Sequence, residues 1–296
     1  MIGDVVYVNG TFVKKEEATV SVFDHGFVYG DGAFEGLQAV AGGIFKLDAH
    51  IERLYRSAHY LGFEIPLSPE AFIAATLETA RRNGLRDGYL RPIVTRGAGP
   101  TGIRHMDKLG TPTVVIVAQH ERPEDRKALL DRGLSAHVVS IRRIPSECLD
   151  ARVKSLNYLN NILAYLEAKH AGADTAILLD VHGNVAEGYG SNVFCVRGGR
   201  VLTPPVGHIL EGITRESILE TCRAESIEAR ETALTVYDLV TADEAFETAS
   251  LAEVAPIVEI DGRRVGNGRT GPVTGRLHAA LRRMMESGRH SRSIGL

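Results

Sequence analysis

The chain has 296 residues, enough for one large domain or two modest ones, and 44% hydrophobic and 24% charged residues, as in ordinary globular proteins. Its net charge of −3 offers no basic surface for nucleic acid or an anionic membrane. The histidines and cysteines show no metal-ligand spacing. No apolar run approaches the ~20 residues of a membrane span, and no signal peptide is visible. We therefore expect a cytoplasmic protein without a metal site.

Turn residues and apolar periodicity predict a first half that mixes strands and helices. Asn9-Gly10 supplies the positive φ angles of a type I′ turn, which predicts a hairpin. Asp48 is the expected N-cap of an amphipathic helix. Arg53 lies off the apolar stripe of that helix. It is interpreted either as a solvated surface arginine or, if the helix borders a pocket, as a phosphate ligand. The predicted strands are 5–8, 11–13, 18–23, 89–95 and 113–118, the predicted helices are 48–61 and 68–84, and a second hairpin turns at 41–43.

The segment 24–36 contains four glycines within eleven residues, mixed with three aromatic residues. Glycine lets a backbone or a ligand approach closely, and aromatic side chains can form the wall of a pocket. The segment is therefore interpreted either as a pocket wall or as a bulged edge strand.

A GxGxxG pattern at 97–102, with Glu121 further on, matches the fingerprint of dinucleotide-binding proteins. That fingerprint requires a helix that opens on its last glycine. Only 103–108 lie between the pattern and the loop before the next strand, which is too little chain for a crossover helix. A nicotinamide-dependent oxidoreductase is therefore an alternative with little support in the local pattern.

The polar, charged stretch 120–132 is the best domain boundary in the sequence. We expect a small N-terminal domain over 1–121, an interdomain linker over 122–134 and a large C-terminal domain over 135–296. In the second half, strands are predicted at 135–141, 174–180, 193–196, 244–248 and 257–260, helices at 156–170, from 214 onward and at 272–285, and an unstructured polar tail at 289–296.

Lysine is rare in this chain, and six of its seven lysines stand beside acidic residues or in charged helical stretches. Lys154 instead ends a short extended run, directly before a predicted helix. Such a junction is held by two rigid elements and suits a reactive group. The alternative is a lysine with a packed stem and its ammonium group in water.

Two further features of the sequence, an isolated acid and a helix start behind a glycine, are compatible with the same cofactor chemistry as a reactive lysine. Glu187 is an acid beside glycines, which could equally be an ordinary loop residue. Thr214 is the expected N-cap of a helix preceded by glycine, where free N–H groups can bind an anion. Pyridoxal phosphate requires a lysine for a Schiff base, an acid opposite its pyridine nitrogen and donors for its phosphate. The combination predicts pyridoxal 5'-phosphate as a cofactor.

The sequence contains motifs that are specific in combination: FDHGFVYGDGAFEG at 23–36, HIERL at 50–54, YLRP at 89–92, KSLNY at 154–158, EG at 187–188, GITR at 212–215 and AE at 252–253. Together they resemble the class IV (fold type IV) pyridoxal phosphate aminotransferases, most closely the branched-chain amino acid aminotransferases. The resemblance runs from Tyr7 to about Leu281. It implies a two-domain α/β fold, with a small N-terminal α/β domain and a larger, barrel-like C-terminal α/β domain. It also implies a homodimer that completes the site.

The resemblance further implies roles for individual residues. Lys154 forms the Schiff base, Glu187 faces the pyridine nitrogen, and Tyr158 hydrogen-bonds the phenolic oxygen of the cofactor. The implied phosphate ligands are Arg53, Ile213, Thr214 and Ser250, and the implied substrate-binding residues are Tyr29, Phe34, Gly36, Tyr89, Arg91, Leu251 and Ala252. The implied reaction, part of branched-chain amino acid biosynthesis, moves the amino group of L-leucine, L-isoleucine or L-valine to 2-oxoglutarate.

Departures from the usual branched-chain pattern leave the substrate open. Leu251 is bulkier than the residue that many members carry in its turn, and Tyr189 stands where many have serine. The loop with Arg104 and His105 is either a second carboxylate clamp or an exposed basic loop. Alternatives of the same fold are a D-amino-acid or (R)-amine transaminase and an aminodeoxychorismate lyase. Outside this fold, the alternative is a non-catalytic ligand-binding protein.

Overall fold

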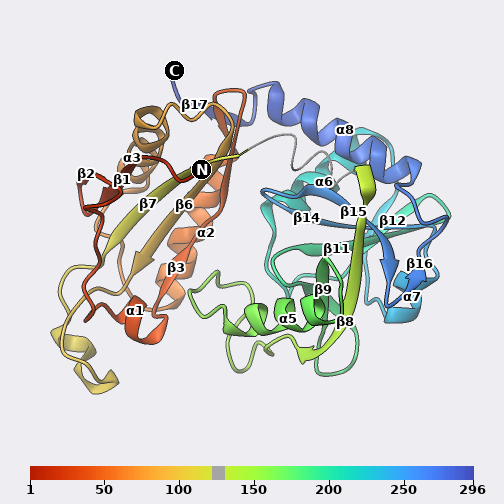
Figure 1. Cartoon of the computed structure of the whole chain (residues 1–296), viewed down its shortest axis with the longest axis horizontal. Helices are drawn as coiled ribbons and strands as arrows, with labels where there is room; N and C mark the ends of the chain where they lie inside the picture. Colours follow the sequence, from red (N-terminus) through yellow and green to blue (C-terminus); the bar gives the residue numbers. More distant parts are fainter. Residues whose placement is uncertain (122–130) are drawn as a thin grey trace. The chain divides into compact units, whose positions relative to one another are not determined.

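The computed structural model describes residues 1–121 and 131–296, which Figure 1 traces along the chain. The chain divides into two compact units. Unit 1 contains Met1–Arg122, Val153–Asn157 and Met284–Leu296, and unit 2 contains Pro123–Arg152 and Tyr158–Arg283. Two short segments expected in the C-terminal domain thus group with the N-terminal residues. Most of the expected linker, 122–130, lies outside the described residues, and the linker stays a prediction.

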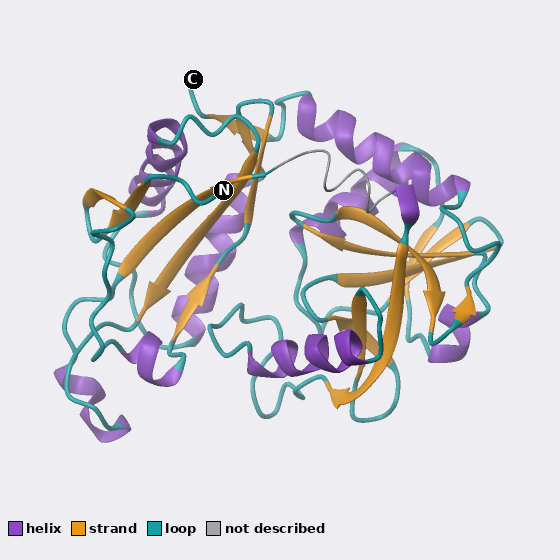
Figure 2. Ribbon diagram, viewed as in Figure 1, coloured by secondary structure: helices purple, strands orange, loops and turns teal. Residues whose placement is uncertain are grey.

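Over the described residues, unit 1 contains an eight-stranded antiparallel sheet with helices packed against it (Figure 2). The strand order is β17-β5-β4-β6-β7-β1-β2, and β3 pairs with β6. The strands are β1 Val5–Val8, β2 Thr11–Lys14, β3 Gly32–Phe34, β4 Leu37–Val40, β5 Gly43–Phe45, β6 Gly88–Thr95, β7 Val114–His120 and β17 Ser291–Ser293. The helices are α1 His25–Tyr29, α2 Leu47–Tyr60, α3 Pro69–Arg82 and the 3-10 helix η1 Ile103–Lys108.

The core of unit 1 lies between this sheet and the apolar faces of α2 and α3. Ile51 and Leu54 belong to the stripe predicted for α2, and both are buried, as is Phe72 of α3. Full burial of such a side chain contributes about 1.5–3 kcal/mol. The cluster therefore fixes α2 against the sheet, and with it the buried residues of α2 that face β3.

The predicted hairpins and long helices of unit 1 are confirmed. β1 and β2 turn at Asn9-Gly10, whose φ angles are 46° and 94°, and α3 begins after the N-cap Ser68. The strand predicted at 18–23 is wrong: these described residues form no strand, and Val20 and Val22 are exposed.

The start of α2 and the end of the chain also differ from the prediction. The N-cap of α2 is Lys46 in a left-handed conformation, because the helix begins directly after β5, and Asp48 instead pairs with Arg292 at 2.6 Å. Arg292 belongs to β17, which pairs with β5. The expectation of an unstructured tail at 289–296 is therefore wrong, since a partner strand far away in the sequence orders it.

The glycine-rich segment 24–36 forms α1 and β3. Asp24 is fully buried and caps α1 by accepting a hydrogen bond from Gly26 N at 2.7 Å. The same carboxylate accepts hydrogen bonds from the hydroxyls of Thr95 and Thr113 at 2.9 and 2.6 Å. The sequence pattern missed α1, because its five residues are too few to show a helical periodicity.

The described part of unit 2 contains a nine-stranded sheet with the order β10-β9-β8-β15-β14-β11-β12-β13, in which β16 pairs with β15 (Figure 2). The strands are β8 Leu134–Arg142, β9 Thr175–Leu179, β10 Val185–Gly188, β11 Asn192–Arg197, β12 Arg200–Thr203, β13 Ala229–Glu231, β14 Glu244–Ala249, β15 Glu253–Ile260 and β16 Arg263–Arg264. The helices are α5 Leu159–His170, α6 Ile213–Ala224, α7 Val236–Val240 and α8 Pro272–Glu286. No helix described in either unit has the length and apolar content to span a membrane.

Two predicted boundaries around the candidate site are wrong. Lys154 does not end a strand: the residues before it form a turn, and α5 begins only at Leu159. Ser155 makes a single bridge with Ala33, so the segment is ordered by strand β3 rather than by a strand of its own. The N-cap of α6 is Gly212 rather than Thr214, which therefore lies in the first turn of the helix.

Candidate active site

Lys154 lies beside β3 in unit 1. Its carbonyl accepts a hydrogen bond from Phe34 N at 3.0 Å, and its own N–H donates to Ser57 Oγ at 3.3 Å. The Lys154 Nζ atom lies 4.5 Å from the centre of the Phe34 ring. An ammonium group at this distance is attracted by the face of an aromatic ring. The backbone contacts and the ring therefore hold the amine at one place on the sheet.

Three further predicted substrate residues are linked to the same ring. The Arg91 guanidinium lies 4.9 Å from the Phe34 ring centre and donates hydrogen bonds to Tyr89 Oη at 2.8 and 3.1 Å. A Cβ at Gly36 would lie 2.6 Å from Tyr89 Oη, so glycine is required for this approach. Unit 1 thus brings Lys154, Phe34, Gly36, Tyr89 and Arg91 together.

Arg53 is buried in unit 1 with an acid that the sequence reasoning did not single out. Arg53 Nε and Nη2 both donate to the Glu35 carboxylate at 2.7 Å, and His50 Nδ1 lies 2.8 Å from Glu35 Oε2. Burial alone would raise the pKa of the Glu35 carboxyl, but Arg53 and His50 hold it well below its usual range. Burial lowers the pKa of His50. The sequence indicates that His50 and Arg53 share one helix face, but not which acid they meet.

Tyr29 and Arg104 lie at the exposed edge of unit 1. Tyr29 Oη accepts a hydrogen bond from Gly102 N at 2.9 Å, which ties α1 to the loop before η1. Arg104 is exposed on η1, and its Nε lies 3.2 Å from His105 Nε2. The structure therefore does not bring Tyr29 or Arg104 into the group around Phe34.

Glu187 is buried on β10 of unit 2 among hydrogen-bond donors. Arg143 Nε donates to Glu187 Oε1 at 2.5 Å, and Leu210 N donates to Oε2 at 3.0 Å. Asn192 Nδ2 lies 3.5 Å from the same Oε2. The sequence analysis did not predict a role for Arg143, because no sequence pattern indicates which distant residue an arginine after a strand contacts.

The first turn of α6 is shaped to receive an anion. Gly212 caps the helix without a side-chain hydrogen bond, so the N–H groups of Ile213 and Thr214 point out of the helix end. A Cβ at Gly212 would lie 1.9 Å from Asn192 Oδ1, so any other residue there would displace the Asn192 side chain. Helix ends with free N–H groups favour phosphate.

The other predicted residues of unit 2 lie in two places. Tyr158 is the N-cap of α5, partly exposed, with its carbonyl accepting from Ile162 N at 2.9 Å. Ser250, Leu251 and Ala252 form the loop between β14 and β15 and are partly exposed. Near this loop on β14, Thr248 Oγ1 is buried and makes no hydrogen bond with any described residue.

The residues fit the chemistry of pyridoxal phosphate as two sets of groups, one in each unit. Unit 1 supplies the amine of Lys154 and the guanidinium of Arg53. Unit 2 supplies the carboxylate of Glu187, the open N-terminus of α6 and the hydroxyl of Ser250. An amine, an acid and several phosphate donors are the set that this cofactor requires.

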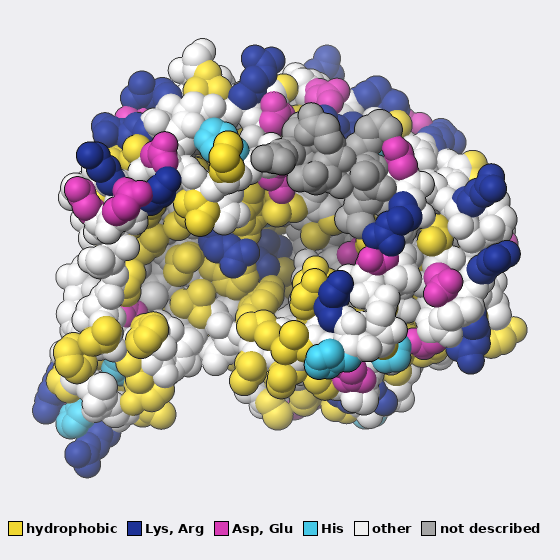
Figure 3. Space-filling model, viewed as in Figure 1, with side chains coloured by type: hydrophobic (Ala, Val, Ile, Leu, Met, Phe, Trp, Pro, Cys, Tyr) yellow, Lys and Arg dark blue, Asp and Glu magenta, His cyan; other side chains and the backbone are white. Residues whose placement is uncertain are grey.

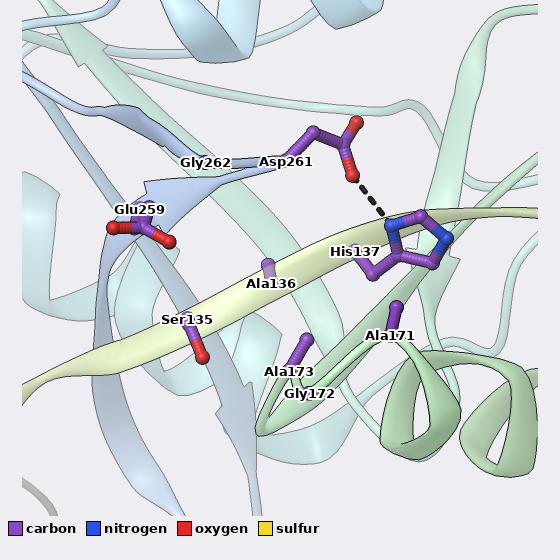
Figure 4. Close-up of a pocket in the computed structure, with 9 residues that line it drawn as sticks. All are labelled: Ser135, Ala136, His137, Ala171, Gly172, Ala173, Glu259, Asp261 and Gly262. Carbon is purple, nitrogen blue, oxygen red and sulfur yellow. Dashed lines mark hydrogen bonds and ion pairs between the residues drawn. The ribbon is translucent and has the colours of Figure 1, made fainter.

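A surface pocket of unit 2 contains none of these residues (Figure 4). It is lined by Ser135, Ala136, His137, Ala171, Gly172, Ala173, Glu259, Asp261 and Gly262. His137 Nδ1 lies 2.7 Å from Asp261 Oδ1 at one side of it, as the dashed line in Figure 4 marks. The pocket is therefore separate from the candidate active site.

Comparison with known proteins identifies the class. The model of the family "Amino-transferase class IV" matches residues 32–260, and the chain belongs to this family. The predicted family, the aminotransferase class and the α/β fold are thus confirmed, in preference to the oxidoreductase alternative.

Individual relatives carry one shared name. The chain is 48% identical to a protein of Methanocaldococcus jannaschii named "Putative branched-chain-amino-acid aminotransferase". The match covers 92% of this chain and 93% of that protein. It is 38% identical to the branched-chain-amino-acid aminotransferase of Pseudomonas aeruginosa, and the match covers 93% of this chain and 91% of that protein. The solved structure of the branched-chain amino acid aminotransferase from Thermobaculum terrenum, in its holo form, superposes with a TM-score of 0.90 at 29% identity, over 100% of this chain and 99% of that chain.

Proposed function

We propose that this protein is a pyridoxal-phosphate-dependent aminotransferase that moves the amino group of L-leucine, L-isoleucine or L-valine to 2-oxoglutarate. The observation that carries the proposal is the position of Lys154 Nζ, 4.5 Å from the centre of the Phe34 ring, the ring that also lies 4.9 Å from the guanidinium of Arg91, which is hydrogen-bonded to Tyr89. A reactive amine, an apolar wall and a cationic carboxylate donor are the groups that a branched-chain amino acid requires. The names of the relatives support branched-chain amino acids as the amino donors.

Pyridoxal phosphate, when bound, supplies an aldehyde that bonds to an amine and a ring that accepts electrons from a broken Cα–H bond. In this proposal Lys154 is the residue whose Nζ would hold the cofactor aldehyde before the substrate amine takes its place. The same amine, once free, would accept the proton from the substrate Cα and carry it, as the general acid and base of the site. Lys154 is therefore the residue that moves the proton.

The remaining groups orient the cofactor. The Glu187 carboxylate, supported by Arg143, holds a proton on the pyridine nitrogen, which strengthens the electron-accepting ring. Tyr158 donates to the phenolic oxygen. Arg53, the N–H groups of Ile213 and Thr214 and the Ser250 hydroxyl bind the phosphate.

The substrate binds through an apolar part and a polar part. Phe34 and Gly36 form the wall for a branched aliphatic side chain, and Leu251 and Ala252 approach the α-carboxylate through their backbone. Arg91, together with Tyr89, receives a carboxylate. The basic loop of Arg104 receives the second carboxylate of 2-oxoglutarate.

We also propose a homodimer located in the cytoplasm. One face of α5 exposes a row of apolar side chains, and hydrophobic side chains gather over α5 on the surface in Figure 3. The row consists of Leu159, Ile162, Leu163 and Leu166, which expose 66%, 51%, 45% and 45% of their surface. Continuous exposed apolar surface of this kind is typical of a protein interface. Sedimentation at several concentrations tests this part.

A half-reaction panel tests the function. The purified protein is loaded with pyridoxal phosphate and mixed separately with L-valine, D-alanine and an (R)-amine, and loss of the cofactor's visible absorbance is followed. We expect reaction with L-valine alone. Reaction with D-alanine or the (R)-amine instead identifies the alternative transaminases, for which the exposed Arg104–His105 pair is the favourable observation. If the loaded protein shows no visible absorbance, the assignment of pyridoxal phosphate as the cofactor is contradicted.

A further inference from the structure

Glu253 has a backbone conformation that glutamate rarely adopts. Its φ angle is +54°, in the left-handed region, and its side chain is 1% exposed. It pairs with Ala249 across the loop of Ser250, Leu251 and Ala252, and is the residue at which that loop re-enters the sheet. In three-residue hairpin loops this position favours glycine. A buried glutamate there requires a compensating contact.

Helix α8 provides that contact. The Glu253 carboxylate lies 2.8 Å from Arg282 Nη1 and 3.1 Å from His278 Nε2. His278 and Arg282 are four residues apart and therefore lie on the same face of α8. Charge-assisted hydrogen bonds to a buried carboxylate are among the strong ones in proteins. Helix α8 thus holds the Glu253 carboxylate, while the Glu253 backbone ends the Ser250–Ala252 loop.

The rest of α8 is itself fixed on unit 2. The Glu244 carboxylate accepts hydrogen bonds from Val273 N and Thr274 N at 3.0 and 2.7 Å, at the start of the helix. Arg276 Nε donates to Glu225 at 2.9 Å. Leu277 and Leu281 are fully buried. Because α8 is anchored at several points, it is a rigid support for the Glu253 contact.

We propose that Glu253, held by His278 and Arg282, is a positioning residue that fixes the Ser250–Ala252 loop for binding the phosphate group of the cofactor. The inference rests on the proposed function, in which Ser250 binds that phosphate. Glycine would satisfy the backbone of this turn without holding it in place. Glutamate accepts a less favourable backbone and gains a connection to α8, so the loop keeps one conformation before the anion arrives.

The test compares two ligands that differ only in the phosphate. Apo-protein is titrated with pyridoxal phosphate and with pyridoxal, and the ratio of their dissociation constants is the readout. Glu253→Gly removes the carboxylate while relieving the left-handed backbone, so the fold is retained, which circular dichroism checks. We expect this variant to bind pyridoxal phosphate about tenfold more weakly and pyridoxal within about twofold of wild type.

A matched control comes from the same unit. Asp261 also has a positive φ, +49°, in a hairpin turn, and its carboxylate also contacts a histidine, His137 at 2.7 Å. Asp261→Gly should leave the ratio unchanged. Arg282→Met should reduce the preference for the phosphate as Glu253→Gly does, and the double variant should lose no more than Glu253→Gly alone.

Three outcomes overturn the inference. If the wild type prefers pyridoxal phosphate and Glu253→Gly keeps the full preference, Glu253 does not position the loop, and the proposed function stands. If the wild type shows no preference for pyridoxal phosphate over pyridoxal, both the proposed function and this inference are overturned. Equal weakening for both ligands assigns Glu253 to general stability and also contradicts the inference.

Discussion

Arg143 donates its Nε–H to Glu187 Oε1 over 2.5 Å, and the two side chains expose only 12% and 5% of their surface. A guanidinium at this distance stabilises the charged form of a carboxylate. Leu210 N adds a backbone donor on the other oxygen at 3.0 Å. The acid is therefore prepared as an anion by its own unit, in advance of any cofactor.

Glu187→Gln is expected to lower kcat with L-valine by about 10²-fold or more, with a much smaller change in cofactor affinity. A neutral amide cannot hold a proton on the pyridine nitrogen by charge. Arg143→Gln should lower kcat in the same direction by a smaller factor. Steady-state kinetics and titration of the apo-protein measure both. Turnover by Glu187→Gln equal to that of Glu259→Gln, a control in the same unit, would contradict the assignment.

Lys154→Ala should fold and lose transamination by at least about 10³-fold, because it removes both the covalent attachment and the proton-transferring amine. Its visible spectrum with pyridoxal phosphate should differ from that of the wild type. Lys169→Ala, on the exposed surface of α5, is the control and should be unaffected. Substantial turnover by the Lys154 variant would sink the role proposed for this lysine.

Arg53→Ala is expected to weaken both cofactor retention and the fold. The sequence pattern allowed a solvated arginine at this position, but Arg53 is 4% exposed and paired with the fully buried Glu35. Removing one partner of a buried ion pair costs about 3–5 kcal/mol, because the other charge stays buried. Urea unfolding measures this cost. Arg53→Met combined with Glu35→Gln should recover part of the stability and none of the phosphate affinity; equal stability of Arg53→Ala and wild type would contradict the argument.

His50 should make stability depend on pH below 6.5. Burial lowers the pKa of His50 from its usual 6.5, so the unfolded chain binds a proton that the folded chain does not. The stabilisation is therefore complete above pH 6.5 and is lost as pH falls toward the folded pKa, by at most about 1.4 kcal/mol per pH unit. Urea unfolding at pH 7.5, 6.5 and 5.5 should show a smaller decline for His50→Gln than for the wild type. Parallel declines would remove His50 as the cause.

Arg104→Ala should raise the KM for 2-oxoglutarate by about tenfold and leave the KM for a branched-chain amino acid nearly unchanged. Arg91 already donates two hydrogen bonds to Tyr89, whereas Arg104 is exposed on η1 beside His105. Lys108→Ala, on the same short helix, controls for a general loss of positive charge. An equal effect on both substrates, or on neither, would assign the second carboxylate to Arg91.

Local chemistry explains which elements could be predicted. Asn9-Gly10 requires positive φ angles that few other pairs accept, and Ser68-Pro69 is a strong helix start, so both appear where the sequence indicates. The apolar stripe of α2 identifies its buried face, because the periodicity of a helix is also a local property of one element. The family motifs named Lys154 and Glu187 as candidate residues, although their roles stay predictions.

The tertiary structure alone decided which distant groups meet. No periodicity indicates that Glu35 is buried against Arg53, that Arg143 reaches Glu187, or that Glu253 is held by α8. These pairs join residues 18 to 44 positions apart, and each depends on the register of strands and the rotation of helices. β17 likewise is a strand only because β5 accepts it. A sequence pattern specifies hydrogen-bonding and burial within one element, whereas the pairing of charges depends on how complete elements pack.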